Sequence, residues 1–270
     1  MARIIVVTSG KGGVGKTTSS AAIATGLSQL GYKTIVIDFD IGLRNLDLVM
    51  GCERKVVYDF INVIEGDATI HQAMIKDKYT DHLFILPASQ TRNKDSLTKD
   101  GIKSILQKLL EMQFEFIICD SPAGIETGAI LSMYFADEAI VIANPEVSSV
   151  RDADRILGMI SSACQRFQKN QLPIKEYLLL TRYNPIRVKQ GDMLSMKDVE
   201  EVLQIPIIGV IPEDTAVLQA SNKGESIILN RSSIAGKTYF DTVYRLLGKK
   251  CDFRFLKEKK MGFFSRFFWR

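Results

Sequence analysis

The sequence predicts an α/β fold, a mainly parallel sheet covered by helices and followed by a C-terminal amphipathic helix. Three observations predict this arrangement. Short apolar runs alternate with segments of helical character, a glycine-rich loop joins the first run to the first helix, and the last residues combine aromatic with basic side chains. Apolar runs without clean alternation are typical of parallel strands that helices cover on both faces.

The apolar runs and helical segments follow one another in the order strand, helix, strand. Gly31 ends the first helix, as glycine commonly does after a helix C-terminus. The predicted strands are Ile4–Val7, Thr34–Asp38, Leu83–Leu86, Phe116–Cys119, Ala139–Ala143, Tyr177–Leu180 and Ile207–Ile211. The predicted helices are roughly Lys16–Leu30, Gly101–Met112, Val150–Arg166, Lys197–Leu203 and Gly236–Leu247. In such sheets ligands bind at the carboxyl ends of the strands.

The composition is that of an ordinary globular protein. The chain of 270 residues is long enough for one large α/β domain, with hydrophobic and charged fractions of 46% and 24%. We predict an ATPase body over residues 1–250 and a membrane-targeting tail over residues 251–270, for the reasons below. The sequence shows no signal peptide and no run of eighteen apolar residues, so we expect a cytoplasmic protein.

The cysteines and histidines exclude several kinds of site. The cysteines lack C-x-x-C spacing, which argues against a zinc site and a disulfide framework. We expect Cys52, Cys119, Cys164 and Cys251 to be reduced and mostly buried. His71 and His82 are the only histidines, and neither lies near a serine, cysteine or carboxylate motif. Histidine-based catalysis is therefore not expected.

The glycine-rich loop after the first strand predicts a phosphate site. Gly10 and Gly15-Lys16-Thr17 match G-x-x-x-x-G-K-[ST], the P-loop spacing of P-loop NTPase sheets. The glycines let backbone N–H groups and the helix dipole face the phosphates, Lys16 reaches the outer phosphates, and the Thr17 hydroxyl binds Mg²⁺. A glycine-rich turn that binds nothing is the alternative. The predicted nucleotide-binding residues here are Gly10, Lys11, Gly12, Gly13, Val14, Gly15, Lys16, Thr17 and Thr18.

Carboxylates follow two of the predicted strands. Asp38 and Asp40 lie two residues apart, so the period of a strand places them on the same side. Beside a triphosphate and Mg²⁺, one carboxylate can hold metal-bound water while the other orients or deprotonates the attacking water. Asp120 ends an apolar run in the Walker B pattern, whose carboxylate binds magnesium directly or through water. The alternative for each is a structural role, such as a helix or turn cap.

Lys11 is an addition that the general P-loop motif does not require. With it, residues 11–17 match K-G-G-x-G-K-T and resemble the deviant Walker A sequence of the ParA/MinD family of P-loop ATPases. The resemblance covers essentially the whole chain. It implies ATP and Mg²⁺ as cofactors and an ATP-sandwiched homodimer, in which Lys11 reaches the nucleotide held by the partner subunit. A solvated loop charge is the alternative for Lys11.

The resemblance also implies roles for individual residues. It assigns Asp38 to the magnesium shell and Asp40 to the attacking water, and it makes residues 42–47 a nucleotide-sensing switch. In related ATPases the loops after the last two strands supply adenine contacts, although ordinary turn chemistry explains those residues as well. The implied set is catalytic Lys11, Lys16, Asp40 and Asp120; metal-binding Thr17, Asp38 and Asp120; and adenine-binding Asn184, Pro212 and Asp214.

A polar segment follows the strand that ends before Asn144. We interpret Ser148 and Ser149 as caps of the next helix, because serine oxygens accept hydrogen bonds from helix N-termini. The resemblance suggests that this helix helps to dock an activating protein. Arg151 and Asp152 are then partner-facing, or simply solvated helix charges.

The C-terminal tail is basic and aromatic. From Lys249 to Arg270 eight basic residues stand against two acidic ones, a balance of +6; the whole chain carries +4, which leaves the body near −2. On a helix, Met261 and the four phenylalanines of the last eight residues share one face. Basic residues beside bulky aromatics indicate an interfacial helix that binds anionic membrane lipid through residues 257–270. A helix packed on the domain or on a partner is the alternative.

The chain most resembles the septum-positioning members of the ParA/MinD family. The resemblance implies an ATPase that dimerises on ATP, becomes peripheral on the cytoplasmic face of the inner membrane and recruits the septum inhibitor MinC. MinE then stimulates hydrolysis, which releases the protein.

Two alternatives to this function remain. A ParA-like DNA-partition ATPase would bind DNA through a basic face, which the near-neutral body argues against, and no sequence-specific nucleic acid is expected. A non-hydrolysing, nucleotide-dependent membrane scaffold is the other, and the presence of Asp40 and Asp120 argues against it.

Overall fold

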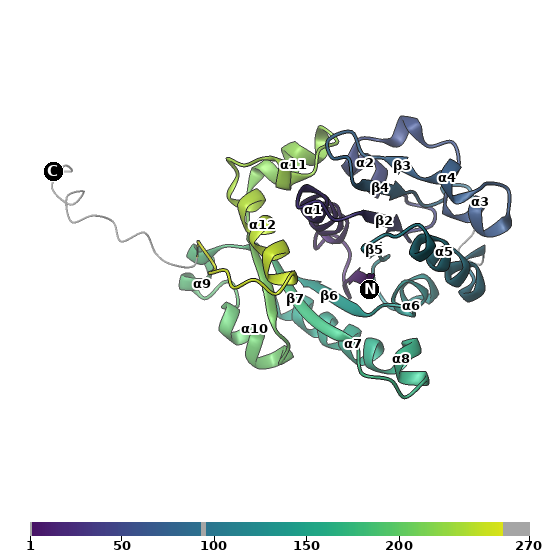
Figure 1. The fold of residues 1–270 in the computed structure, drawn as a ribbon. Helices are drawn as coiled ribbons and strands as arrows, with labels where there is room; N and C mark the ends of the chain where they lie inside the picture. The colour runs from purple at the N-terminus through teal and green to yellow at the C-terminus, as the bar shows by residue number, and fades with distance from the viewer. Residues whose placement is uncertain (1, 93–95, 256–270) are drawn as a thin grey trace, which may run out of the picture.

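An eight-stranded sheet runs through the body in the order β3-β4-β2-β5-β1-β6-β7-β8, and helices cover both of its faces (Figure 1). The computed structural model describes residues 2–92 and 96–255. The strands are β1 Arg3–Thr8, β2 Thr34–Asp38, β3 Ile75–Lys76, β4 Leu83–Leu86, β5 Phe116–Asp120, β6 Glu138–Ala143, β7 Lys175–Tyr183 and β8 Ile207–Pro212. Neighbouring strands run parallel to each other except β3 and β4, which are antiparallel. The predicted α/β, mainly parallel sheet is confirmed, whereas the amphipathic tail at 257–270 lies outside the described residues.

The helices form two layers. Buried side chains of α1, α2, α11 and α12 pack on one face of the sheet, and those of α3, α5, α6, α7 and α10 pack on the other. The α-helices are α1 Lys16–Gln29, α2 Leu46–Met50, α3 Phe60–Glu65, α4 Ile70–Ala73, α5 Lys99–Glu111, α6 Thr127–Met133, α7 Val147–Ala163, α8 Gln165–Gln168, α9 Pro185–Gln190, α10 Met196–Leu203, α11 Thr215–Asn222 and α12 Ile234–Leu246. Short 3₁₀ turns cover Glu53–Lys55 and Ile227–Leu229.

Helix α1 carries the phosphate loop and is buried along nearly its whole length. Its small Ser and Ala side chains let α12 and the sheet approach closely, and Ile23 and Leu27 are fully buried. A Cβ at Gly26 would lie 2.6 Å from Ile228 and 2.8 Å from Val243, so only glycine allows this packing. Burial of a large aliphatic side chain contributes about 1.5–3 kcal/mol, which fixes the loop on a rigid element.

The sequence prediction omits the shorter helices α2, α3, α4, α6, α9 and α11, and it differs from the structure at two further places. Strand β3 is antiparallel to β4 and only two residues long, so the sequence contains no apolar run that predicts it. The helix predicted over Val150–Arg166 begins earlier and breaks at Cys164, whose ψ of 156° is extended. The Cys164 thiol then accepts a hydrogen bond from the Phe167 amide and caps α8.

The expectation that most of the cysteines are buried is confirmed. The cysteines are free, with Cys52, Cys119 and Cys164 buried and Cys251 half-buried. Across residues 2–92 and 96–255, none of the helices is both long and apolar enough to span a bilayer.

Candidate functional site

The loop between β1 and α1 presents the N-terminus of α1 to a ligand. Gly13 and Gly15 have φ angles of 75° and 98°, in the left-handed region that favours glycine. Gly15 is the N-cap of α1, and within the described residues no side chain caps this helix. Its first backbone N–H groups and its dipole therefore face the loop and favour an anion.

Helix α7 lies directly against this loop. A Cβ at Gly10 would lie 2.4 Å from the Asp152 carbonyl oxygen, so glycine is required for the loop to pass the helix. The capping interpretation of Ser148 and Ser149 is wrong, because α7 begins at Val147 with Glu146 as its N-cap. Both serines lie inside the first turn, and the Ser149 hydroxyl instead accepts a hydrogen bond from the Asn144 amide at 3.0 Å.

Lys16 is the cation at the centre of the site. The residue is 8% exposed, and burial lowers the pKa of its ammonium group although Asp120 and Asp40 raise it. A buried cation between two carboxylates and a helix N-terminus is positioned to meet phosphate oxygens. The structure thus brings three of the predicted site residues together.

Asp38 and Asp120 lie opposite each other at the ends of the paired strands β2 and β5. Asp38 is fully buried and accepts hydrogen bonds from the Asp40 amide at 2.9 Å and the Leu46 amide at 3.2 Å. Burial, and then the negative charge of Asp120, raise the pKa of Asp38 well above its ordinary value. Two adjacent buried carboxylates with raised pKa values indicate a place where a cation or a proton is held.

Asp120 is tied to helix α1 by hydroxyl groups. The Ser20 hydroxyl donates to its carboxylate at 2.8 Å, and the Thr17 hydroxyl also hydrogen-bonds it. Burial raises the pKa of Asp120 to about 6, against the lowering effects of Ser20, Thr17 and Lys16. Sequence reasoning missed Ser20, although its position three residues after Thr17 places both hydroxyls on one helix face.

The residues present fit a magnesium nucleotide. Hydroxyl and carboxylate oxygens are the hard ligands that Mg²⁺ prefers, and Mg²⁺ usually takes one or two protein groups together with phosphate oxygens and water. Among the described residues, no group of three or more acidic, Cys or His side chains could hold a metal ion. The hydroxyl of Thr8, fully buried at the end of β1, has no hydrogen-bond partner among those residues, as expected for a group beside a polar ligand.

Lys11 lies at the surface of the loop, beside the start of α7. Its ammonium nitrogen is 3.7 Å from the Glu146 carboxylate and 3.5 Å from the Ser148 hydroxyl. Half-exposed in a single chain, it makes no contact that tests the implied reach across a dimer. That role stays a prediction.

The predicted switch at residues 42–47 contains both anchored and exposed groups. The Gly42 amide donates to the Ser89 carbonyl at 2.8 Å, and Arg44 pairs with the buried Asp47 at 2.7 Å. Leu43 between them is 67% exposed. The segment therefore exposes an apolar side chain to solvent while its two ends are held in place.

A pocket of about 460 Å³ opens beside the P-loop and fits a nucleoside base. It is lined by Val14 of the loop and Thr18 of α1, by Pro212 at the end of β8 and Asp214 after it, and by apolar residues of α11. Two of its polar lining residues are Tyr239 and Arg182. The Tyr239 hydroxyl forms a hydrogen bond with the Ser19 hydroxyl at 2.9 Å, and the Arg182 guanidinium donates to the Gly13 carbonyl at 2.9 Å. Burial raises the pKa of Tyr239 to about 12. Sequence reasoning missed both, because no motif marks them.

The three predicted adenine contacts are placed differently. Pro212 and Asp214 line this pocket, whereas Asn184 lies beside it and caps α9 by accepting the Ile186 and Arg187 amides. Burial alone would raise the pKa of the Asp214 carboxyl group. Its carboxylate accepts hydrogen bonds from the Ser233 hydroxyl at 2.7 Å and from backbone amides, and because these outweigh burial, the pKa of Asp214 is lowered. Whether the three residues touch adenine stays a prediction.

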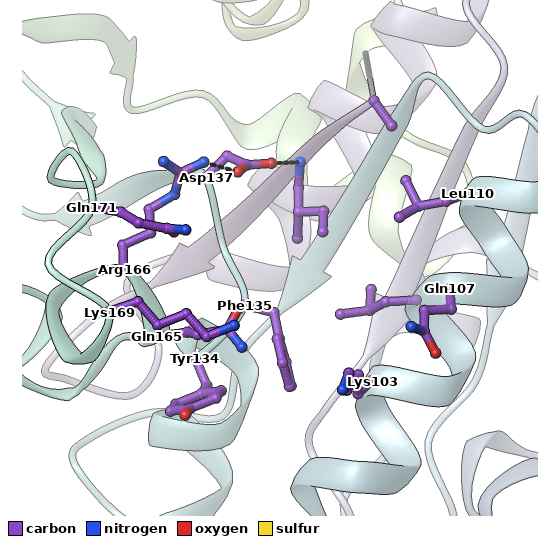
Figure 2. A pocket seen from close by; sticks show the side chains of 13 residues that line it. Lys103, Gln107, Leu110, Tyr134, Phe135, Asp137, Gln165, Arg166, Lys169 and Gln171 are labelled. Atoms are coloured by element: carbon purple, nitrogen blue, oxygen red, sulfur yellow. Dashed lines mark hydrogen bonds and ion pairs between the residues drawn. The ribbon is translucent and has the colours of Figure 1, made fainter.

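A second hollow lies at the opposite edge of the sheet and is drawn in Figure 2. Its volume is about 440 Å³, and its walls are α5, α8 and the segment before β6. The Asp137 carboxylate there accepts hydrogen bonds from the Ile4 amide at 3.1 Å and from the Arg166 guanidinium. Each oxygen thus has a structural partner, and none of the predicted site residues lines this hollow.

Known proteins resemble this chain in sequence and in fold. The family described as CobQ/CobB/MinD/ParA nucleotide binding domain matches residues 5–227. Over 270 residues the chain is 74% identical to the septum site-determining protein MinD of Buchnera aphidicola subsp. Schizaphis graminum, with 100% of both chains covered.

Two solved structures extend this similarity. The MinC:MinD cell division protein complex of Aquifex aeolicus matches with a TM-score of 0.84 and 39% identity, over 94% of this chain and 98% of that chain. The septum site-determining protein MinD of Pyrococcus horikoshii OT3, complexed with Mg-ADP, matches with a TM-score of 0.78 and 28% identity, over 91% and 96%. The structural similarity therefore extends over more than nine tenths of this chain.

Proposed function

The chain belongs to the CobQ/CobB/MinD/ParA nucleotide-binding family, and from this premise we propose that it is an ATPase that positions the division septum. It uses ATP and Mg²⁺ as cofactors, in keeping with a relative solved with Mg-ADP. The observation that carries the proposal is the convergence of Lys16, Asp38, Asp40 and Asp120 at the N-terminus of α1, beside a pocket of base size.

Each residue has a task that its position suits. The P-loop amides and the Lys16 ammonium bind the outer phosphates. Thr17, Asp38 and Asp120 hold Mg²⁺, which neutralises charge on the phosphates when it is bound. Asp40, half-buried and close enough to Lys16 and Asp120 to shift their pKa values, orients the attacking water and accepts its proton.

The same proposal extends to the assembly. Two subunits close on ATP with Lys11 at the partner's nucleotide, and the exposed Leu43 and Val147 beside the P-loop are covered in that dimer. The paired tails, residues 257–270, bind anionic lipid more tightly than one tail, because the second binding event is intramolecular. The dimer recruits MinC, and MinE stimulates hydrolysis and so releases the protein from the membrane.

The two rival functions lack comparable support. A DNA-partition ATPase needs a basic face, and the body of this chain carries a net charge near −2. A non-hydrolysing scaffold has no use for the carboxylate arrangement around Lys16. Retained lipid binding with no measurable turnover would nevertheless favour it.

Co-sedimentation with anionic liposomes tests the proposal. The full chain, a version ending at Lys260, and Lys16→Ala are each mixed with ATP or with ADP. We expect only the full chain with ATP to sediment. Equal sedimentation with both nucleotides, or full binding by Lys16→Ala, would contradict control of the membrane by ATP.

A further inference from the structure

Residues 251–255, the first part of the predicted tail, lie on the body and are called the strap below. Figure 1 shows it leaving the end of α12 and running toward α9. Phe253 and Phe255 pack against the hydrophobic core, and the Phe255 ring meets the buried Tyr183 with ring centroids 6.1 Å apart. Both side chains follow residue 250 in the sequence and pack on the body.

Arg245, in the last turn of α12, holds the start of the strap. Its guanidinium donates to the carbonyls of Cys251 at 2.8 Å and Asp252 at 2.9 Å, and it lies 4.1 Å from the centroid of the Phe253 ring. It also donates to the Ile208 carbonyl at 3.0 Å, at the residue that the β7–β8 register skips. One side chain thus joins a helix, an edge strand and the strap.

Asp241, one turn earlier on α12, holds the end of the strap. Its carboxylate side chain is 2% exposed and pairs with the Arg254 guanidinium at 2.8 Å. A buried carboxylate that lost this partner would remain as an uncompensated charge, so the pair favours the docked strap. The last residue of the strap, Phe255, packs against Tyr183. The residue before Tyr183, Arg182, donates a hydrogen bond to the carbonyl of Gly13 in the P-loop.

We propose that Arg245 and Asp241 are positioning residues for membrane attachment, because they fix the place on the body from which the tail starts. This inference rests on the proposed function of the tail. With the strap docked, Met261, the first residue of the apolar face, lies six positions after Phe255; with the strap released, it lies thirteen positions after Gly248. Effective concentration falls with about the −3/2 power of tether length, so release weakens ATP-dependent lipid binding about threefold.

Asp241→Asn separates this idea from simple electrostatics. The substitution removes a negative charge, so attraction to anionic lipid alone predicts equal or tighter binding. Release of the strap predicts weaker binding. Glu200→Gln is the matched control, since it makes the same charge change at an exposed side chain with no hydrogen bond or ion pair among the described residues.

Cys251 supplies a reporter of strap release within the native chain. Its thiol is half-buried in the strap, while the other three cysteines are buried. Arg245→Ala should speed its labelling by a maleimide, although loss of the nearby cation by itself disfavours the reactive thiolate. Thermal melts and ATP affinity of each variant show whether the body and the P-loop are intact.

The test is liposome titration of the full chain with ATP, at 30% anionic lipid. We expect Asp241→Asn and Arg245→Ala to need about threefold more lipid for half-maximal binding, and Glu200→Gln to need no more than the parent. Unchanged Cys251 labelling in Arg245→Ala, or faster labelling with unchanged lipid demand, would overturn the inference. Failure of the parent to bind lipid with ATP would instead contradict the proposed function.

Discussion

Asp120 and Asp137 lie at opposite ends of the strands of one sheet, and their carboxylates differ in how well they are paired. Asp137 precedes β6 and has a donor for each oxygen, the Ile4 amide and the Arg166 guanidinium. Asp120 ends β5, faces the carboxylate of Asp38, and has its pKa raised to about 6 by burial. The amino edge of the sheet is thus built for stability, while the carboxyl edge retains unfavourable charge that a magnesium nucleotide relieves.

The largest expected effect comes from Asp40. If it activates the attacking water, Asp40→Asn lowers the ATP turnover number about 10²–10⁴-fold, the usual contribution of a general base. ATP binding is retained, because the phosphates are held by the P-loop. Steady-state hydrolysis and equilibrium nucleotide binding, measured on the same preparation, check both statements. An unchanged turnover number would remove Asp40 from the chemistry.

Lys16 comes next in size. Lys16→Ala removes a charge-assisted contact to phosphate from a buried position, and we expect ATP affinity to fall about a hundredfold. Fluorescent-nucleotide titration checks this loss. Because the buried ammonium is replaced by a neutral group, the melting temperature without nucleotide should change little or rise. A variant with parental affinity would contradict the assignment of the loop.

Asp137→Ala tests whether the amino ends of the strands serve stability alone. It leaves the Ile4 amide and the Arg166 guanidinium without their acceptor, which should cost about 2 kcal/mol of unfolding free energy. Hydrolysis per folded molecule should stay as in the parent. Urea unfolding together with turnover numbers gives the answer, and a selective loss of turnover would show that this edge also serves catalysis.

The smallest effect concerns Asp120 and pH. A carboxyl whose folded-state pKa is raised loses stability as the pH rises from its unfolded value, near 4, through about 6. Asp120→Asn does not titrate, so its gain in unfolding free energy over the parent should be about 1 kcal/mol larger at pH 7.5 than at pH 5. Denaturant unfolding at both pH values, without nucleotide, measures the difference. If Asp120→Asn gains the same unfolding free energy over the parent at both pH values, the pKa of Asp120 is not raised in the folded state.

Much of the fold could be predicted from the sequence because strands covered on both faces leave short apolar runs. Seven of the eight strands correspond to such runs. Strand β3, two residues long, and the break at Cys164 could not be predicted, since neither carries an apolar pattern or a Gly or Pro signal. Short helices such as α9 depend on single caps, here Asn184, that a sequence pattern does not separate from a turn.

The functional residues, like the fold, could be predicted from the sequence only in part. Lys16 and Asp120 belong to motifs with fixed spacing, so the sequence placed them beside one another correctly. Ser20, Tyr239 and Arg245 act through tertiary contacts between segments far apart in the chain, and no local pattern marks them. Only packing reveals such residues.

In the proposed function, ATP hydrolysis at the carboxyl ends of the strands releases the chain from the membrane. A time course of liposome sedimentation after addition of limiting ATP, with the parent and Asp40→Asn side by side, tests this claim most directly. We predict that the parent binds and then returns to the supernatant as ATP is consumed, while Asp40→Asn binds to the same extent and stays bound. Release of both proteins at the same rate would contradict it.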